Sequence, residues 1–240
     1  MIAPALVLAG HQPAYLPWPG YLSRLLDLDR FLLLDHVQYS RGWQHRNYIA
    51  GPCGQRRLTV PVTHRFGQTI DQARIADDRW RGRHWRILRE TYHHAEFWPQ
   101  WAPRLAAVYN RRWDRLIELD QAVLELLLEG FGIQIGLLRS SDLQPQGRKT
   151  QMLIDLCRLT DSRTLRVGAG ALDYLDFAAL AEAGIGVQIA TYGHPPYPRG
   201  RQPFIPGLSA LDLLLHQGPA GSRILSRGGQ LTTWTGAIPA

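Results

Sequence analysis

The chain has 240 residues, 45% of them hydrophobic, which is enough to bury a core and argues against a disordered protein. No stretch reaches the ~20 consecutive apolar residues of a membrane span, so we expect no such span. The formal net charge of +7 comes almost entirely from arginine, because Lys149 is the only lysine. No nucleic-acid-binding motif accompanies this charge, so we do not expect nucleic acid as the principal ligand.

The first nine residues are apolar and uncharged, and they run directly into His11 and Gln12. A signal peptide would begin with a basic segment, so we interpret this stretch as a buried strand instead. The two cysteines, Cys53 and Cys157, form neither a disulfide framework nor a metal-ligand spacing. This cysteine usage is typical of a reducing compartment, and we expect a cytoplasmic protein.

The N-terminal third predicts a parallel sheet. Residues 5–9 form an apolar strand, a proline-rich aromatic loop follows, residues 20–26 form a short helix, and residues 31–34 form a second apolar strand. Strand, helix and strand within 35 residues are typical of a right-handed crossover. Residues 57–62 alternate in polarity and predict an edge strand, because Pro61 interrupts them.

The rest of the chain alternates between helical and strand patterns. Residues 79–131 have helical periodicity, and further strands are expected at 133–138, 164–167 and 187–190. Helices are expected at 150–157, 178–183 and 209–216, and we expect the last 20 residues to be loosely ordered. The pattern predicts one α/β domain over 1–240 with a helical insertion at about 79–131. Its sheet is open, mostly parallel, and Rossmann-like or nucleotidyltransferase-like.

Five polar segments follow predicted strands directly. Ligands of open α/β sheets bind beyond the carboxyl ends of the strands, so these segments are expected to converge on one site. They are His11-Gln12, the segment from Asp35 to Gln38, Arg139-Ser140-Ser141, Gly168-Ala169-Gly170, and Tyr192-Gly193-His194-Pro195.

Three residues are candidates for catalysis. His11 and His194 can serve as a general base, because the pKa of histidine lies near neutrality. Asp35 can orient that base or hold an amine. The alternative for His11 and Asp35 is capping of a loop or turn.

A further set of residues is expected to bind substrate through amide, guanidinium, imidazole or aromatic groups. These residues are Gln12, Tyr15, Gln38, Arg46, Asn47, His84 and Tyr197. Loop packing and a solvated surface are the alternatives for the aromatic and the charged members. The adjacent pair His93-His94 is a poor metal site, and we expect no bound metal. Cys157 lies in a predicted amphipathic helix and is interpreted as a core thiol.

Taken together, the motifs resemble those of the WbqC-like proteins of bacterial O-antigen, surface-polysaccharide and natural-product gene clusters. The matching stretches run in order along the chain. They are His11-Gln12-Pro13, Tyr15-Leu16-Pro17-Trp18, Gly20-Tyr21, Asp35 with Val37-Gln38, Trp43 with Arg46-Asn47 and Ile49, His84 with Leu88 and Tyr92, Ser140-Ser141, Tyr174-Leu175-Asp176, Gly184-Ile185, His194-Pro195 with Tyr197, Phe204-Ile205-Pro206, Leu208-Ser209 and Leu211-Asp212.

The resemblance implies a transferase that places glycine or a similar aminoacyl group on a sugar. The chain departs from the family at His36, where a second aspartate is common, and at Tyr48, where arginine is usual. The loss of that second carboxylate makes a two-carboxylate metal site less expected here.

Three functions remain open at this point. The first is acyl or aminoacyl transfer that forms an amide between a small or carrier-bound acyl donor and an amine acceptor, without a cofactor. In that reaction His11 or His194 would take the proton, and Gln12, Asn47 or Arg46 would stabilise the oxyanion. The second is nucleotidyl transfer or adenylate formation, which would use ATP and Mg²⁺. The third is non-enzymatic binding of an anionic ligand. The oligomeric state does not follow from the sequence.

Overall fold

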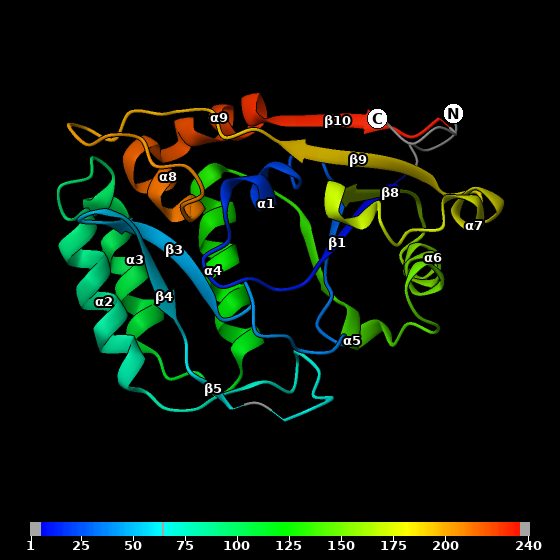
Figure 1. The fold of residues 1–240 in the computed structure, drawn as a ribbon, viewed down its shortest axis with the longest axis horizontal. Helices are drawn as coiled ribbons and strands as arrows, with labels where there is room; N and C mark the ends of the chain where they lie inside the picture. The colour runs from blue at the N-terminus through cyan, green and yellow to red at the C-terminus, as the bar shows by residue number, and fades with distance from the viewer. Residues whose placement is uncertain (1–5, 64, 236–240) are drawn as a thin grey trace.

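The computed structural model describes residues 6–63 and 65–235, and its centre is an open six-stranded sheet (Figure 1). The strand order is β10-β9-β8-β1-β2-β7, and all neighbours are parallel except β10, which runs antiparallel to β9. The mixed α/β class and the mostly parallel open sheet were therefore predicted correctly. The strands are β1 (Leu6–His11), β2 (Arg30–Leu33), β7 (Gly136–Arg139), β8 (Ser162–Gly168), β9 (Gly186–Tyr192) and β10 (Gly229–Thr233).

The central strands are apolar because both of their faces are covered. Ala9 and Phe31 belong to one hydrophobic core, whereas their chain neighbours Leu8 and Leu32 belong to a second core. This alternation follows from the two-residue period of a strand, and two covered faces require nearly continuous hydrophobic residues. The apolar runs of β1 and β2 thus explain their place in the middle of the sheet.

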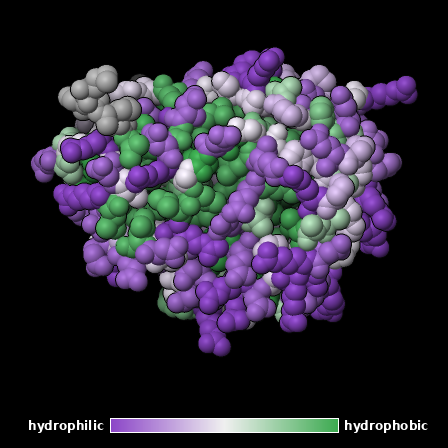
Figure 2. Space-filling model, turned by 180° about the vertical axis from the view of Figure 1, so that it is seen from behind, coloured by the Kyte–Doolittle hydropathy of each residue, from purple (hydrophilic) through white to green (hydrophobic). Residues whose placement is uncertain are grey.

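Helices cover both faces of the sheet (Figure 1). The core on one face includes residues of α4 (Leu116–Phe131) and α8 (Ala210–Gln217), and the core on the other includes residues of α6 (Thr150–Leu159) and α7 (Phe177–Glu182). Figure 2 shows a group of hydrophobic residues, bordered by polar ones, on the side turned away from the viewer in Figure 1. Within 6–63 and 65–235 there is no helix whose length and apolar character would let it cross a membrane.

A long excursion separates β2 from β7. It contains the hairpin of β3 (Arg46–Gly51) and β4 (Gly54–Thr59), and the short pair β5 (Val62–Thr63) and β6 (Arg74–Ile75). The helices α2 (Arg79–Tyr92) and α3 (Trp98–Asn110) follow and lead into α4. The helical character expected for about 79–131 is confirmed as these three helices.

Some expectations need correction. The expected strand 57–62 is divided, since Pro61 lies between β4 and β5. The loose order expected for residues 221–240 is wrong for 221–233, because α9 (Gly221–Gly228) leads directly into β10. The expected first strand includes Ala5, which lies outside the described residues, as do residues 236–240.

The remaining elements are short. They are α1 (Pro19–Ser23), α5 (Ser140–Leu143), and the 3-10 turns η1 (Ala169–Ala171) and η2 (Gly218–Ala220). Of these, α1 and η1 matter most, because they follow β1 and β8. The chain builds the sheet from β1 through β2 to β7 and then continues on the other side of β1 with β8, β9 and β10. The connections after β1 and β8 therefore diverge, and a crevice is expected between them.

Candidate functional site

Two adjoining cavities lie at this switch point of the sheet, and both are bordered by Arg24, Gly168 and Gly170. The smaller, of about 260 Å³, is also lined by His11 and Tyr174. The larger, of about 450 Å³, lies on the side of α9, β9 and β10. Its lining includes Trp18, Ser23, Asp27, Tyr192 and Gln230. The crevice thus lies where ligands of open α/β sheets bind.

His11 stands at the end of β1, and its orientation is fixed. Its Nδ1 lies 2.8 Å from the carbonyl oxygen of Gln12, and its ring meets the edge of Tyr21 at 4.9 Å between centroids. A carbonyl only accepts hydrogen bonds, so Nδ1 carries the proton and Nε2 keeps a lone pair. Burial and then the charge of Arg24 lower the pKa of His11 to about 4. The imidazole is consequently neutral at neutral pH.

Arg24 is a site residue that the sequence analysis did not select. It follows α1 directly, and a Cβ atom built on Gly168 would stand 2.5 Å from its Nη2 atom. Its Nε atom is buried without a hydrogen-bond partner among the described residues. Burial lowers its pKa from the ordinary value. The signal for Arg24 is a lone arginine in the apolar run that follows the first loop.

Arg166 supports the backbone on which Arg24 lies. It is 3% exposed and donates from Nη1 to the carbonyl oxygens of Arg24, at 3.0 Å, and Leu26, at 2.6 Å. Its Nε group donates to Gln188 at 3.0 Å. These bonds connect β8 and β9 to the turn after α1, so the fold fixes the base of the crevice from two sides.

The loop between His11 and α1 is held in a strained conformation. Leu16 has a φ of 49°, a region that costs a branched residue about 1–3 kcal/mol. The buried side chain of Asn47 donates to the carbonyl oxygen of Leu16 at 2.6 Å and accepts from the N–H of Tyr48 at 2.8 Å. The Asn47 amide thus braces the loop and is not aimed at the crevice.

Tyr15 and His84 also support this loop from inside the core. The Tyr15 hydroxyl lies 2.9 Å from Nδ1 of His84 and 2.7 Å from the hydroxyl of Tyr109. Tyr15 is 0% exposed and His84 is 3% exposed. Neither side chain lines the two cavities. Both residues were expected to bind substrate, and the geometry instead gives them contacts that position the loop.

Asp35 meets the serines that follow β7, as the strand-end pattern predicted. Its carboxylate accepts hydrogen bonds from Ser140 Oγ at 3.0 Å, Ser141 N at 2.8 Å and Ser141 Oγ at 2.8 Å. His36 Nδ1 contacts the same Ser140 hydroxyl. Among the bonds of the described residues, none joins Asp35 to His11 or His194. Asp35 is 0% exposed and connects the ends of β2 and β7.

His194 lies outside the smaller cavity. Its ring packs against Trp18 at 5.3 Å and Tyr192 at 5.4 Å between centroids, and the side chain is exposed. Both neighbours line the larger cavity, so His194 stands behind its aromatic wall. The structure thus separates the two histidines that were expected to act as a base.

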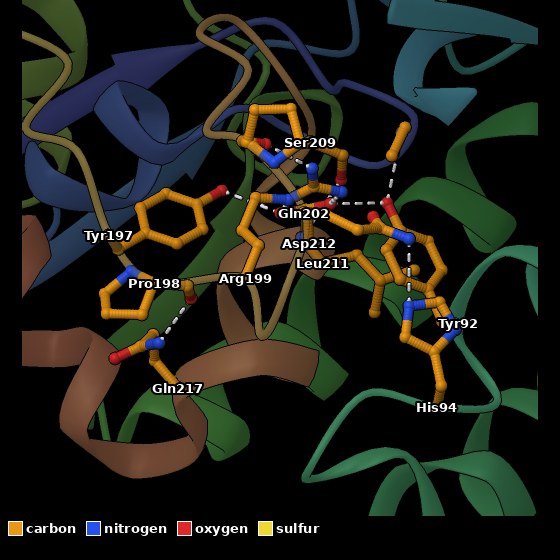
Figure 3. Close-up of polar contacts among 12 residues, drawn as sticks. Tyr92, His94, Tyr197, Pro198, Arg199, Gln202, Ser209, Leu211, Asp212 and Gln217 are labelled. Atoms are coloured by element: carbon orange, nitrogen blue, oxygen red, sulfur yellow. Dashed lines mark hydrogen bonds and ion pairs between the residues drawn. The ribbon is translucent and has the colours of Figure 1, made fainter. Parts of the chain in front are cut away.

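Tyr197 is committed to a buried ionic cluster (Figure 3). Its hydroxyl donates to Asp212 Oδ1 at 3.0 Å, and the hydroxyl of Tyr92 donates to Oδ2 at 3.0 Å. The guanidinium of Arg199 makes a two-point contact with the same carboxylate, from Nε and Nη2 at 2.9 Å each. This cluster fastens the segment after β9 onto α8, which explains the burial of Tyr197.

Of the other expected binding residues, Gln38 and Arg46 lie apart from the crevice, and Gln12 follows His11 directly. Gln38 is exposed and forms a β-bridge with Thr69, and Arg46 donates to the carbonyl oxygen of Arg41 at 3.4 Å. Gln12 is half-buried, and its Oε1 accepts a hydrogen bond from Gln44. Among residues 6–63 and 65–235, no three His, Cys, Asp or Glu side chains are grouped so that they could hold a metal ion.

The chain is an α/β protein with a crevice at the switch point of an open sheet, where ligands of such sheets bind. The model of the WbqC-like protein family matches residues 12–224, so the chain belongs to that family. It is also 32% identical over 212 residues to an uncharacterized protein, Rv1507c, of Mycobacterium tuberculosis. That match covers 86% of this chain and 92% of the mycobacterial protein. The resemblance seen in the sequence is thereby confirmed.

Proposed function

We propose that the protein is a transferase that forms an amide by acyl or aminoacyl transfer to an amine. The observation that carries this proposal is the Nε2 lone pair of His11, fixed by the bond from Nδ1 to Gln12. A neutral imidazole in a small cavity can accept the proton that an attacking amine loses. The cavity of about 260 Å³ beside it is of a size for a small amine substrate.

In the proposed step, the amine nitrogen attacks the carbonyl carbon of an acyl thioester. A C–N bond forms, the C–S bond breaks, and the sulfur leaves as a thiolate. The proton lost by the amine passes to Nε2 of His11 and then to the thiolate, so no cofactor is consumed. An aminoacyl ester would react in the same way, with an alkoxide as the leaving group.

The hydrogen bonds of the candidate residues limit which of them can stabilise the oxyanion or orient the base in the proposed reaction. The Asn47 amide and the Arg46 guanidinium donate to backbone carbonyls, which leaves Gln12, next to His11, as the proposed oxyanion donor. We assign Asp35 to positioning the strand ends, because two serines occupy its carboxylate. We place the reaction in the cytoplasm, where free thiols such as that of Cys53 stay reduced. Sugar amines of surface-polysaccharide or natural-product pathways are the proposed acceptors.

Two matched variants test this proposal. His11→Gln removes the base. His194→Gln makes the same change at the histidine that packs against Trp18 and Tyr192, outside the smaller cavity. Purified protein is incubated with an acyl thioester and a panel of amines, and free thiol and amide are measured without ATP. We expect His11→Gln to lower kcat by about 10²–10⁴-fold and His194→Gln to change it by less than about threefold. Unchanged turnover in His11→Gln would refute the role of His11.

Nucleotidyl transfer or adenylate formation is the second candidate, and the guanidinium of Arg24 beside the Gly168 turn favours it. This reaction would release pyrophosphate from ATP in the presence of Mg²⁺. It would release no thiol from an acyl thioester in the assay without ATP. The third candidate, non-enzymatic binding of an anionic ligand, predicts neither thiol nor pyrophosphate release. The two product assays therefore separate all three functions.

A further inference from the structure

The guanidinium of Arg24 lies between the two cavities and borders both. No hydrogen bond or ion pair of this side chain is found within residues 6–63 and 65–235, and its Nε atom is buried. By contrast, the buried Arg199 has all the bonds to Asp212 described above, and Arg166 is bonded to backbone carbonyls. A half-buried charge without a partner is costly, so a partner from outside the chain is expected.

Among the described residues, no carboxylate forms an ion pair with Arg24. The ionisable groups that act on its pKa are the phenols of Tyr21 and Tyr174. Burial raises the pKa of each phenol, so both are neutral at neutral pH. Asp27 borders the larger cavity, but its electrostatic effect falls on Arg166. Within residues 6–63 and 65–235, the positive charge at the junction of the cavities therefore has no ion-pair partner.

The backbone beside Arg24 is shaped to leave room for the guanidinium. Gly168 has an extended backbone, with φ of −84° and ψ of 162°, that any residue can adopt. A Cβ atom at this position would still collide with Arg24, at 2.5 Å from Nη2 and 2.9 Å from Cζ. At Gly170, which lines the same cavities, a Cβ atom would meet nothing within 4 Å. A residue larger than glycine at 168 would therefore require the guanidinium of Arg24 to move, and one at 170 would not.

We propose that Arg24 binds an oxyanion, the phosphate or carboxylate of a small-molecule ligand, at the junction of the two cavities. The planar fork of a guanidinium binds two oxygens of such a group at once. The uncharged remainder of the ligand lies in the larger cavity, against the aromatic rings of Trp18 and Tyr192. The polar side chain of Gln230 also borders that cavity and provides hydrogen bonds to the remainder.

An oxyanion on Arg24 also acts on His11. Burial is the largest cause of the low pKa of His11, and the charge of Arg24 is the second. The other ionisable groups that line the smaller cavity or touch the His11 ring are Tyr174 and Tyr21, which are neutral. An anion that neutralises Arg24 removes the second cause and raises the pKa of His11. Ligand binding would then strengthen the base of the proposed reaction, and this consequence rests on the proposed function.

Calorimetric titration with inorganic phosphate and, separately, with acetate tests the site without any turnover. We expect phosphate to bind more tightly than acetate at neutral pH because it carries more charge, and we expect binding to weaken as salt is added. Arg24→Gln should weaken phosphate binding by at least about tenfold. Gly168→Ala should weaken it as well, whereas the matched Gly170→Ala should bind like the unchanged protein.

A second readout is the titration of the His11 ring by NMR, assigned by its loss in His11→Gln. Both phosphate and Arg24→Gln should raise the pKa of His11 above about 4. If Arg24→Gln does not fold, Gly168→Ala, which keeps the charge, provides the test together with Gly170→Ala. A preference for acetate would identify the ligand group as a carboxylate.

The proposal is overturned if Arg24→Gln binds phosphate as tightly as the unchanged protein does, and likewise binds acetate as tightly. Amide formation without oxyanion binding would refute the Arg24 site and leave the proposed function standing. Oxyanion binding without amide or thiol formation would refute the proposed function and leave the Arg24 site standing.

Discussion

Replacing Asp212 with alanine tests how the segment after β9 is held. Asp212 and Arg199 are 0% and 1% exposed, and their side chains share two hydrogen bonds of 2.9 Å. Asp212→Ala leaves a guanidinium buried without its counter-ion, which typically costs about 3–5 kcal/mol. The hydroxyls of Tyr92 and Tyr197 lose their acceptor in the same variant. We therefore expect the free energy of unfolding to fall by at least about 3 kcal/mol.

The assay is urea unfolding followed by tryptophan fluorescence, and a double-mutant cycle isolates the pair. Arg199→Met alone should also destabilise, and the double variant should be much less destabilised than the sum of the two single variants. Glu90→Ala is the control, because its ion pair with Arg86 is exposed and worth less than about 0.5 kcal/mol. A loss below about 1 kcal/mol in Asp212→Ala would refute the reasoning.

Three further results are expected from buried groups. Burial holds the pKa of His45 and of His84 at about 4. The unfolded chain binds protons from about pH 6.5 downward, so unfolding free energy measured in urea should fall between about pH 6.5 and 4, and a flat profile would contradict this. Burial raises the pKa of the Cys157 thiol to about 12, so a thiol reagent should modify one cysteine, Cys53, in the native protein and both in urea. Asp120 is buried, neither of its oxygens is hydrogen-bonded among the described residues, and burial raises its pKa. Asp120→Leu should therefore raise the free energy of unfolding by about 1–3 kcal/mol at pH 7. A destabilised variant would show that the Asp120 carboxyl has a partner.

The sequence carries the information for elements whose burial dictates their composition. The apolar runs of β1 and β2 follow from two covered faces, and the periodicity of α4 follows from its buried face. Strand β10 has no such signal, because four of its five residues are exposed and its pairing with β9 determines it. Strand β3 was missed for a related reason, since its polar residues serve the hairpin with β4 and the loop at Leu16.

The candidate site also contains residues that local sequence predicts and residues that only the tertiary fold brings together. The position of a residue after a strand could be read locally, and His11, Asp35 and Ser140 were found in this way. Arg24 was missed because an arginine in sequence is most often a surface residue. Only the approach of β8, more than a hundred residues away, places Gly168 against its guanidinium. The oxyanion site that we propose there depends on the absence, among the described residues, of a carboxylate paired with Arg24.

Residual hydrogen-bonding capacity separates the residues that shape the site from those available to a ligand. Asp35 lies at a strand end like His11, but three donors from two serines occupy its carboxylate. Within the described part of the chain, His11 keeps the Nε2 lone pair after its bond to Gln12, and the buried Nε of Arg24 has no partner. Buried polar groups cost free energy unless they find partners, so unused capacity that borders a cavity points to a ligand that supplies the partner. By this criterion we propose that the centre of the site lies between His11 and Arg24, where Asn47, Tyr15 and His84 position the adjoining loop.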